Sequence, residues 1–364
     1  MKPITSIGIA LALTLGIQLK GASINAEDFQ KQLEEFREKF DLSAMVVGVW
    51  EGEKPLFRHA FGYSQAGVEA ELDMKFRAGG VCLTSVTAAL LLTAEEGTVS
   101  IDDPIDQWMP DLPEADKVTL RMLANCTAGY GDYVPNQDFI DAFENDPFRF
   151  FSEEELIEYG IGSDVIYPPG TDWNYSHTNF VVLGLILEKI HGKTVPEILE
   201  EKVISPLALK DTVYTEGPSL APPVLHSFTT ERGIFEESTF WNPSWTSFSG
   251  SLAAPLDDVA KIIRGIGSAS LITPASLEEM IAPTTVGLSR NTAERYYAMG
   301  LGVDQGKWLM QNPNFGGYQG IVLYNMETDL TMVAFVTLGQ DTDPEAHHGM
   351  KILPILRSAV KNGE

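Results

Sequence analysis

A tyrosine and a histidine separated by one residue are the side chains of this chain best suited to proton transfer. Tyr175 and His177 lie in a segment rich in polar residues. An imidazole titrates near neutral pH and can accept a proton from water, while a phenol can pass a proton on. The pair allows acid–base chemistry with water as nucleophile. The alternative is a histidine that makes only a structural hydrogen bond, and the sequence favours this alternative.

Other candidate motifs for chemistry carry less weight. Ser358 and Lys361 have Ser-x-x-Lys spacing but stand on the expected last helix, beside the end of the chain, where fraying is common. Ser64 lacks the final glycine of a Gly-x-Ser-x-Gly elbow. His347 and His348 are adjacent on a polar loop, without the spacing of a metal site. We therefore expect no metal and no cofactor.

Five short segments share their order and spacing with a known group of hydrolases. They are Phe76-Arg77, Glu95-Glu96-Gly97, Asp102-Asp103-Pro104, Thr119-Leu120-Arg121 and Thr127-Ala128-Gly129. Together they resemble the serine β-lactamase and DD-peptidase family, in particular its class C, carboxypeptidase and esterase branch. Residues 174–180 resemble the second motif of that family, Tyr-x-Asn, and residues 313–320 resemble the third, in which Lys or His precedes x-Gly.

The resemblance implies that the catalytic residues of the family are replaced in this chain. The nucleophilic Ser and the Lys of Ser-x-x-Lys correspond to Gly80 and Leu83, the Asn of the second motif to His177, and the cation of the third to Asn314. Only Tyr175 is kept. Gly80 has no hydroxyl to acylate and Leu83 cannot accept a proton. Without a lysine beside it, we expect the Tyr175 phenol to keep a pKa of about 10. Catalysis by the family route should be lost.

Binding does not require those side chains. The resemblance places the two backbone N–H donors of an oxyanion hole at Gly80 and near Tyr318, and it adds Tyr175, His177, Asn314 and Gly316 as candidate ligand-binding residues. The expected ligand is peptide-like, or a small carbonyl or carboxylate compound. Trp241, Trp245 and Phe248 either line a pocket or pack in the core, and the sequence leaves this choice open.

The order of expected elements indicates an α+β fold, with an antiparallel sheet flanked by helices and a mainly helical lobe. Residues 1–26 resemble a signal peptide, and residues 27–364 form one domain, with an α/β lobe (27–78 and 290–364) and a helical lobe (79–289). Periodicity predicts helices at 28–40, 81–96, 153–159, 178–191, 195–203, 256–266 and 350–360, strands at 45–50 and 59–63, and a hairpin at 320–337.

Composition excludes some partners. The formal charge of −26 repels nucleic acid and anionic lipid. The apolar run of the expected signal is too short for a membrane span, so we expect an exported protein, periplasmic or extracellular. Cys82 and Cys126 could form a disulfide or remain buried thiols. Three functions stay open: a non-catalytic binding protein, an enzyme using Tyr175 and His177, and a structural protein whose cleft is filled by side chains.

Overall fold

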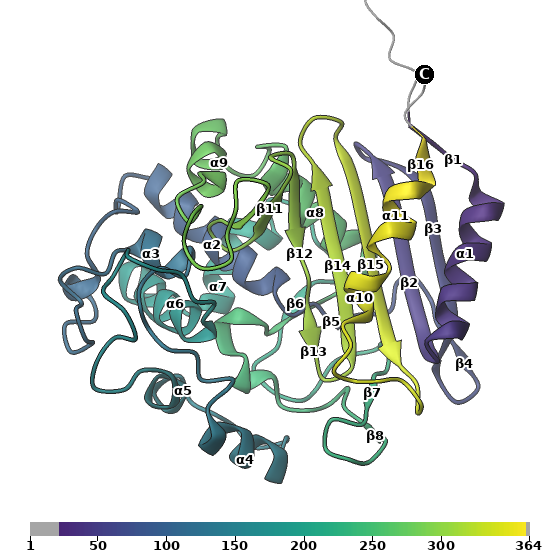
Figure 1. Ribbon diagram of the computed structural model, residues 1–364, viewed down its shortest axis with the longest axis horizontal. Coiled ribbons are helices and arrows are strands. Elements are labelled where there is room, and N and C mark those ends of the chain that lie inside the picture. The colour runs from purple at the N-terminus through teal and green to yellow at the C-terminus, as the bar shows by residue number, and fades with distance from the viewer. Residues whose placement is uncertain (1–21, 362–364) are drawn as a thin grey trace, which may run out of the picture.

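A computed structural model describes residues 22–361, and Figure 1 shows a sheet with helices on both faces and a helical lobe beside it. The helices are α1 (Ala26–Lys39), α2 (Val81–Glu95), α3 (Leu120–Ala124), α4 (Gln137–Asn145), α5 (Glu153–Gly160), α6 (His177–His191), α7 (Val195–Leu199), α8 (Leu256–Gly267), α9 (Pro274–Ile281), α10 (His348–Lys351) and α11 (Leu353–Ala359). Short 3₁₀ helices lie at Ile105–Gln107, Pro243–Trp245 and Ser247–Ser249, and a π-helical turn at Glu200–Ile204. The expected signal peptide falls mostly in residues 1–21, outside the described part of the chain.

Both ends of the chain contribute strands to the main sheet. The strands are β1 (Ser23–Ile24), β2 (Leu42–Glu51), β3 (Lys54–Gln65), β4 (Val68–Glu69), β5 (Phe76–Arg77), β6 (Val213–Tyr214), β7 (Phe228–Thr229), β8 (Glu236–Glu237), β9 (Leu252–Ala254), β10 (Arg295–Tyr297), β11 (Gly302–Asp304), β12 (Trp308–Gln311), β13 (Asn314–Phe315), β14 (Tyr318–Asn325), β15 (Leu330–Leu338) and β16 (Val360–Lys361). The nine-stranded sheet has the order β10-β11-β12-β14-β15-β2-β3-β4, with β13 also paired to β14. Its pairs are antiparallel.

The central strands are hydrophobic on both faces because both faces are covered. In β2, Ala44 and Val46 belong to the larger core, under α2, α6 and α8, while Met45, Val47 and Val49 point to the second core, under α1 and α11. Successive side chains of a strand point to opposite faces, so this alternation divides one strand between two cores. Figure 1 shows α1 (purple) and α11 (yellow) near each other, on the side of the sheet away from the helical lobe.

Helix α2 runs through the middle of the molecule and is buried along most of its length. Its hydroxyl side chains bond to carbonyl groups one turn earlier: Ser85 Oγ to Val81 O at 2.8 Å and Thr87 Oγ1 to Leu83 O at 2.9 Å. A buried hydroxyl without a partner would be costly, and these bonds remove that cost. The helix ends before Gly97, whose φ of +75° suits a residue without a side chain.

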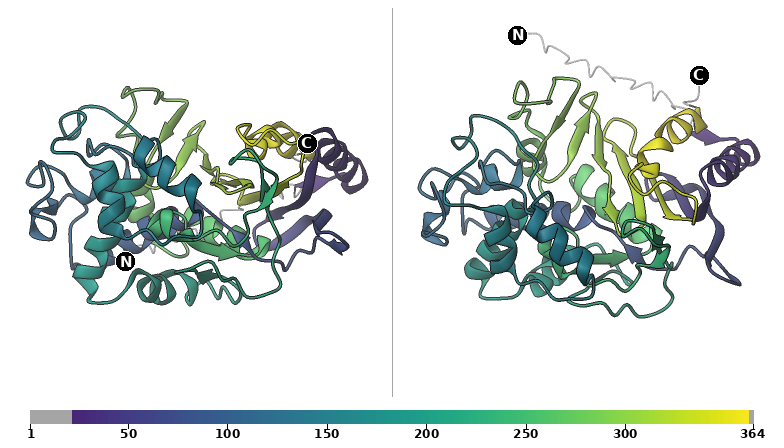
Figure 2. Two further views of the ribbon diagram at one scale, coloured as in Figure 1. Left: turned by 90° about the horizontal axis from the view of Figure 1, so that it is seen from below. Right: turned by 60° about the horizontal axis from the view of Figure 1, so that its bottom comes forward.

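The α+β fold expected from the sequence is confirmed, with two local differences. The helix expected over 195–203 continues from α7 as a π-helical turn. The last helix is divided into α10 and α11; Pro354 lacks the N–H that would continue the helical bonding. Figure 2 shows the helical lobe (blue to teal) standing beside the sheet from two further directions. Among the described residues, no helix has both the length and the apolar character to span a membrane.

Candidate ligand-binding cleft

The N-terminus of α2 forms the floor of a cleft. Gly79 has a φ of +50°, and Gly80 caps the helix without a side-chain hydrogen bond. A Cβ atom built on Gly80 would lie 2.8 Å from Gln311 Oε1, which is closer than Cβ atoms come to other atoms. The Gln311 amide is held in place, because its Nε2 donates to Gly300 O at 2.6 Å and to Thr84 Oγ1 at 2.8 Å. The space that a nucleophilic side chain would need is therefore occupied.

The edge strand beside Gly80 shows which residue of the third motif faces the helix. β12 and β13 pair with β14 in one continuous register, from Trp308 with Asn325 to Phe315 with Tyr318. In this register Gln311, rather than Asn314, lies over Gly80. Asn314 is exposed and lines the cleft at its rim. Both residues line the cleft, and Gln311 is the one whose side chain approaches Gly80.

The backbone donor near Gly80 also differs from the expected one. Gly320 N donates to Pro313 O at 2.8 Å, and bonded pairs alternate in an antiparallel ladder. Tyr318 therefore bonds within the ladder, while the Asn314 N–H points away from β14, and a Cβ built on Gly79 would lie 3.5 Å from Asn314 N. The candidate donor pair is Gly80 and Asn314.

Two of the expected ligand-binding residues are not in this cleft. The Tyr318 side chain is fully buried, and its hydroxyl donates to Leu225 O. Gly316 accepts at its carbonyl from Ser227 Oγ at 3.1 Å and lines a neighbouring cavity of about 400 Å³. The Tyr318 side chain does not border a ligand in this cleft, because its ring belongs to the larger core. Leu83 is likewise in that core, as its side chain requires.

Tyr175 and His177 do lie together in the cleft, as expected. Their rings meet edge to face, with centroids 4.9 Å apart. His177 Nδ1 is 3.1 Å from both carboxylate oxygens of Asp132, and the His177 backbone N–H donates to Oδ1, also at 3.1 Å. The carboxylate thus stabilises the start of α6 and orients the imidazole. With Nδ1 bonded to Asp132, Nε2 is the ring nitrogen that remains for a ligand or a water molecule.

The Tyr175 phenol is not an ordinary one. Burial raises its pKa well above 10, and the nearby thiol of Cys126 and carboxylate of Asp132 act in the same direction. The expectation of a pKa of about 10 was therefore wrong. Because its pKa is raised, even less of the Tyr175 phenol is ionised at neutral pH, so it is a still poorer general base there. Tyr175 acts here as a neutral hydroxyl and as an aromatic wall.

The cleft has a volume of about 390 Å³, within the range of small-molecule sites. Its lining includes Gly79, Gly80, Val134, Trp173, Tyr175, His177, Trp245, Thr246, Ser249, Gly250, Arg290, Tyr297, Gln311, Asn312, Pro313, Asn314 and His347. The Arg290 guanidinium lies 5.1 Å from the Trp173 ring centre, and within residues 22–361 no carboxylate pairs with it. A cation is therefore available at the rim of the cleft.

The open choices about cysteines and aromatic residues are resolved by packing. Cys82 and Cys126 are both buried free thiols, and burial raises the pKa of each to about 12. Trp241 and Phe248 are buried in the protein, whereas Trp245 lines the cleft. Among the described residues, no group of three or more candidate ligand side chains is placed to hold a metal ion.

Among the residues that sequence reasoning missed are Gln311 and Arg290, which line the cleft, and Asp132, which bonds to His177. Gln311 had a usable signal, since counting back along the edge strand from the turn at residues 316–317 gives its place in the register. His347 was taken for a solvated loop residue, but it lines the cleft, with Nε2 3.0 Å from Asn312 O. Burial lowers the pKa of His347 below its ordinary value.

A family model described as Beta-lactamase matches residues 29–356. The chain belongs to this family. Among curated relatives of this chain, penicillin-binding protein 4* of Bacillus subtilis is 26% identical over 198 residues, which are 50% of this chain and 40% of the relative. Esterase EstB of Burkholderia gladioli is 26% identical over 188 residues, 48% of this chain and 47% of the relative. The chain spans 40% to 66% of the length of the first such relatives.

Solved structures with the same fold cover most of this Beta-lactamase family member. A D-stereospecific amidohydrolase from Streptomyces sp. aligns with a TM-score of 0.78 at 21% identity, over 89% of this chain and 97% of that one. D-amino acid amidase from Ochrobactrum anthropi SV3, complexed with L-phenylalanine amide, aligns with a TM-score of 0.77 at 18% identity, over 91% and 98%. These likenesses confirm the β-lactamase/DD-peptidase-like fold expected from the motifs.

Proposed function

We propose that this protein is a non-catalytic member of its hydrolase family that binds a small peptide-like or carboxylate ligand in the cleft above Gly80. The observation that carries the proposal is the position of the Gln311 amide. It occupies the place where a side chain at position 80 would stand, and two hydrogen bonds hold it there. Acyl transfer needs a nucleophile beside the donors of the oxyanion hole, and position 80 supplies no side chain that could serve as one.

The remaining polar groups of the cleft support binding. Gly80 and Asn314 line the cleft, and we assign their backbone N–H groups as donors to a carbonyl or carboxylate oxygen; Arg290 at the rim supplies a positive charge. The empty volume of about 390 Å³ speaks against a purely structural protein with a filled cleft. A hydrogen bond between a charged group and its partner contributes about 1.5–3 kcal/mol, so a small carboxylate should bind in the millimolar range.

The test combines two measurements on the same purified protein. Intact mass spectrometry after incubation with a fluorophosphonate and with a penicillin should show no added mass. Amide NMR during titration with D-phenylalanine, chosen because a structural neighbour is a D-amino acid amidase solved with this compound bound, should show shifts at residues 79–83 and 311–314. A stoichiometric adduct on a Ser or Thr of the cleft would overturn the non-catalytic proposal. Absence of shifts at millimolar ligand would overturn the binding proposal.

A second candidate function rests on the pairing of His177 with Asp132. An imidazole held at Nδ1 by a carboxylate can accept a proton from water at Nε2, and this would allow slow hydrolysis of a bound amide or ester without a covalent intermediate. Turnover of D-phenylalanine amide that is lost in Asp132→Asn and in His177→Ala would favour this enzyme. Turnover at the uncatalysed rate in all three proteins would exclude it.

We also propose that the protein is exported, on the basis of residues 1–26. N-terminal sequencing of the protein recovered from its native cells should find a start near Ser23 or Ala26. A chain that starts at Met1 or Lys2 would contradict cleavage.

A further inference from the structure

A second cavity lies at the opposite end of the main sheet from Gly80. Its volume is about 540 Å³. It is lined by Trp50, Gly52, Glu53, Pro55, Arg58, Pro206, Leu207, Asp257, Ala260, Lys261, Arg264, Gly265, Ser270 and Thr331. The register places it there: Leu330 pairs with Glu51 at this end of β15, whereas Thr337 pairs with Tyr318 near the other end. We call it the α8 groove.

From the structure we infer that the α8 groove binds a planar aromatic molecule bearing one anionic group, such as an aryl carboxylate. This inference concerns a site separate from the cleft and does not depend on the function proposed above.

The floor of the groove is apolar and is shaped by glycine. Gly265 has no side chain, and Leu207 fills that place, since a Cβ on Gly265 would lie 2.6 Å from Leu207 Cδ2. Trp50 packs over Gly48 in the same way, with its ring 2.1 Å from where a Gly48 Cβ would stand. Trp50, Leu207, Ala260 and Pro55 therefore give the groove an apolar part, and an aromatic ring can pack against such side chains.

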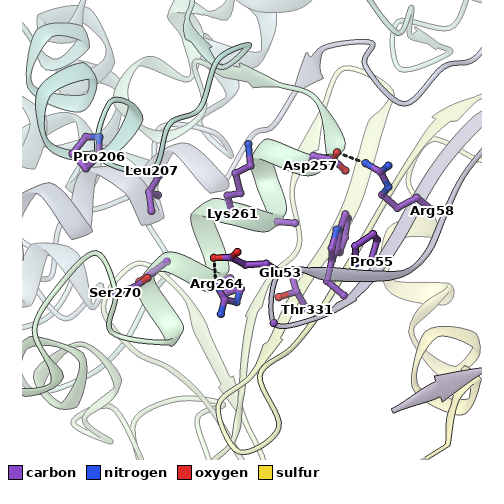
Figure 3. A pocket seen from close by; sticks show the side chains of 14 residues that line it. Glu53, Pro55, Arg58, Pro206, Leu207, Asp257, Lys261, Arg264, Ser270 and Thr331 are labelled. Atoms are coloured by element: carbon purple, nitrogen blue, oxygen red, sulfur yellow. Dashed lines mark hydrogen bonds and ion pairs between the residues drawn. The ribbon is translucent and has the colours of Figure 1, made fainter. Parts of the chain in front are cut away.

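The rim carries three cations, Arg58, Lys261 and Arg264, and each of them is paired with a carboxylate. Asp257, Lys261 and Arg264 are four and three residues apart on α8, so they share one face of the helix. Figure 3 shows them along α8, with Arg58 on β3 across from Asp257 and Glu53 at the hairpin beside Arg264. Three cations and two acids therefore line the groove.

The cations have donors to spare. Lys261 Nζ bonds to Asp258 Oδ1 at 2.8 Å and has two further N–H groups. Arg264 uses Nε and Nη2 for Asp329, each at 2.9 Å, and Nη1 is left with Glu53 at 3.6 Å. Arg58 holds Asp257 through Nη1. An entering anion would meet N–H groups from more than one cation.

Glu53 is the competitor that an anionic ligand would have to displace. Its side chain is 91% exposed, and its contact with Arg264 is long. Exposed pairs of this kind contribute little. A ligand carboxylate that also reaches Lys261 would therefore replace Glu53 at Arg264 Nη1. This gives opposite signs for two substitutions: removal of the Glu53 charge should tighten binding, and removal of the Lys261 charge should weaken it.

The experiment titrates 1-naphthoate, and separately its neutral counterpart 1-naphthamide, into the ¹⁵N-labelled protein. We expect amide shifts at residues 50–58 and 257–265, with naphthamide binding about tenfold more weakly because it lacks the charge. Lys261→Ala should weaken naphthoate binding about fivefold and Glu53→Gln should tighten it about twofold, in keeping with exposed ion pairs.

Two matched controls separate local from global charge effects. Lys117→Ala removes a lysine that, like Lys261, pairs with an acid three residues earlier. Glu327→Gln removes an acid that, like Glu53, lies 3.6 Å from its cation. Both controls should leave naphthoate binding unchanged.

Three outcomes would overturn the inference. The first is equal affinity for naphthoate and naphthamide, and the second is a Lys117→Ala effect as large as that of Lys261→Ala. The third is a set of shifts confined to residues 79–83 and 311–314, which would place the carboxylate in the cleft instead. Because the two sets of amides do not overlap, failure here leaves the proposed function of the cleft untouched.

Discussion

The two sides of the cleft differ in what their polar groups are bonded to. On the α2 side, the Gln311 amide bonds to Gly300 O and Thr84 Oγ1, and Leu83 is in the core. On the α6 side, the His177 imidazole is oriented by Asp132 with Nε2 left over, and Arg290 is stacked on Trp173. On the α2 side, which holds the positions compared with the family nucleophile and base, the polar groups are bonded within the protein, while the opposite side has groups that can meet a ligand.

This difference is consistent with the proposed loss of a catalytic pair. A lysine kept at position 83 without its serine would be a buried charge without a partner, whereas leucine adds apolar contact. Gln311 fills the space left by the missing side chain at position 80. Ligand binding should therefore depend on the α6 side and the rim. The predictions below test that contrast, from the largest expected effect to the smallest.

Restoring the lysine should have the largest effect. Leu83→Lys places an ammonium group in the larger core and should lower the free energy of unfolding by about 3–5 kcal/mol at pH 7. Burial depresses the pKa of such a lysine below its unfolded value, so stability is lost as pH falls through the unfolded pKa and recovers towards pH 10. Urea denaturation at pH 7 and pH 10 measures both. The control, Leu83→Met, should cost less than about 1.5 kcal/mol, and equal stability of the two variants would contradict a dry core here.

A smaller loss is expected from adding a side chain at position 80. Gly80→Ala should cost about 1–3 kcal/mol, because the new methyl group collides with Gln311 Oε1. In Gln311→Ala the collision is absent, so the same change at position 80 should cost at least about 0.5 kcal/mol less. A double-mutant cycle of thermal or urea unfolding measures this coupling. Additive effects would mean that Gln311 does not restrain position 80.

On the other side of the cleft, the expected effect is on binding. Arg290→Ala should weaken the binding of a small carboxylate such as D-phenylalanine about tenfold, which corresponds to about 1.4 kcal/mol, with no change in thermal stability since the side chain is exposed. Lys117→Ala removes an exposed cation elsewhere and serves as the charge control. If Arg290→Ala and Lys117→Ala bind the carboxylate with equal affinity, Arg290 contributes only to the overall charge of the protein and does not contact the ligand.

The smallest effects should come from the aromatic and imidazole groups. His177→Ala and Tyr175→Phe should each weaken the same binding by about 0.5–1.5 kcal/mol, as the loss of one neutral hydrogen bond does. His59→Ala is the control, because His59 lies on β3 and bonds to Gln30. His347 is unsuitable as a control, since it lines the cleft. Wild-type affinity in both variants would place the ligand away from α6.

Much of the fold could be predicted because its signals are local. Alternation of apolar residues predicted the hairpin of β14 and β15, and the buried run from Val81 predicted α2 up to Gly97. Strands that bury both faces are hydrophobic throughout, which hides the division of β2 between two cores. That division follows only from which helices cover each face.

The sequence alone determined that no hydroxyl stands at position 80 and no amine at position 83, which is the basis for proposing that the family reaction is lost. Only the tertiary structure decided that Gln311 covers Gly80, that Asp132 holds His177, and that Trp245 faces the cleft while Trp241 is buried. The reason is physical: a missing side chain is a property of one residue. What fills the space it leaves depends on packing between segments distant in the chain, such as β12 against α2, and no local pattern records that contact.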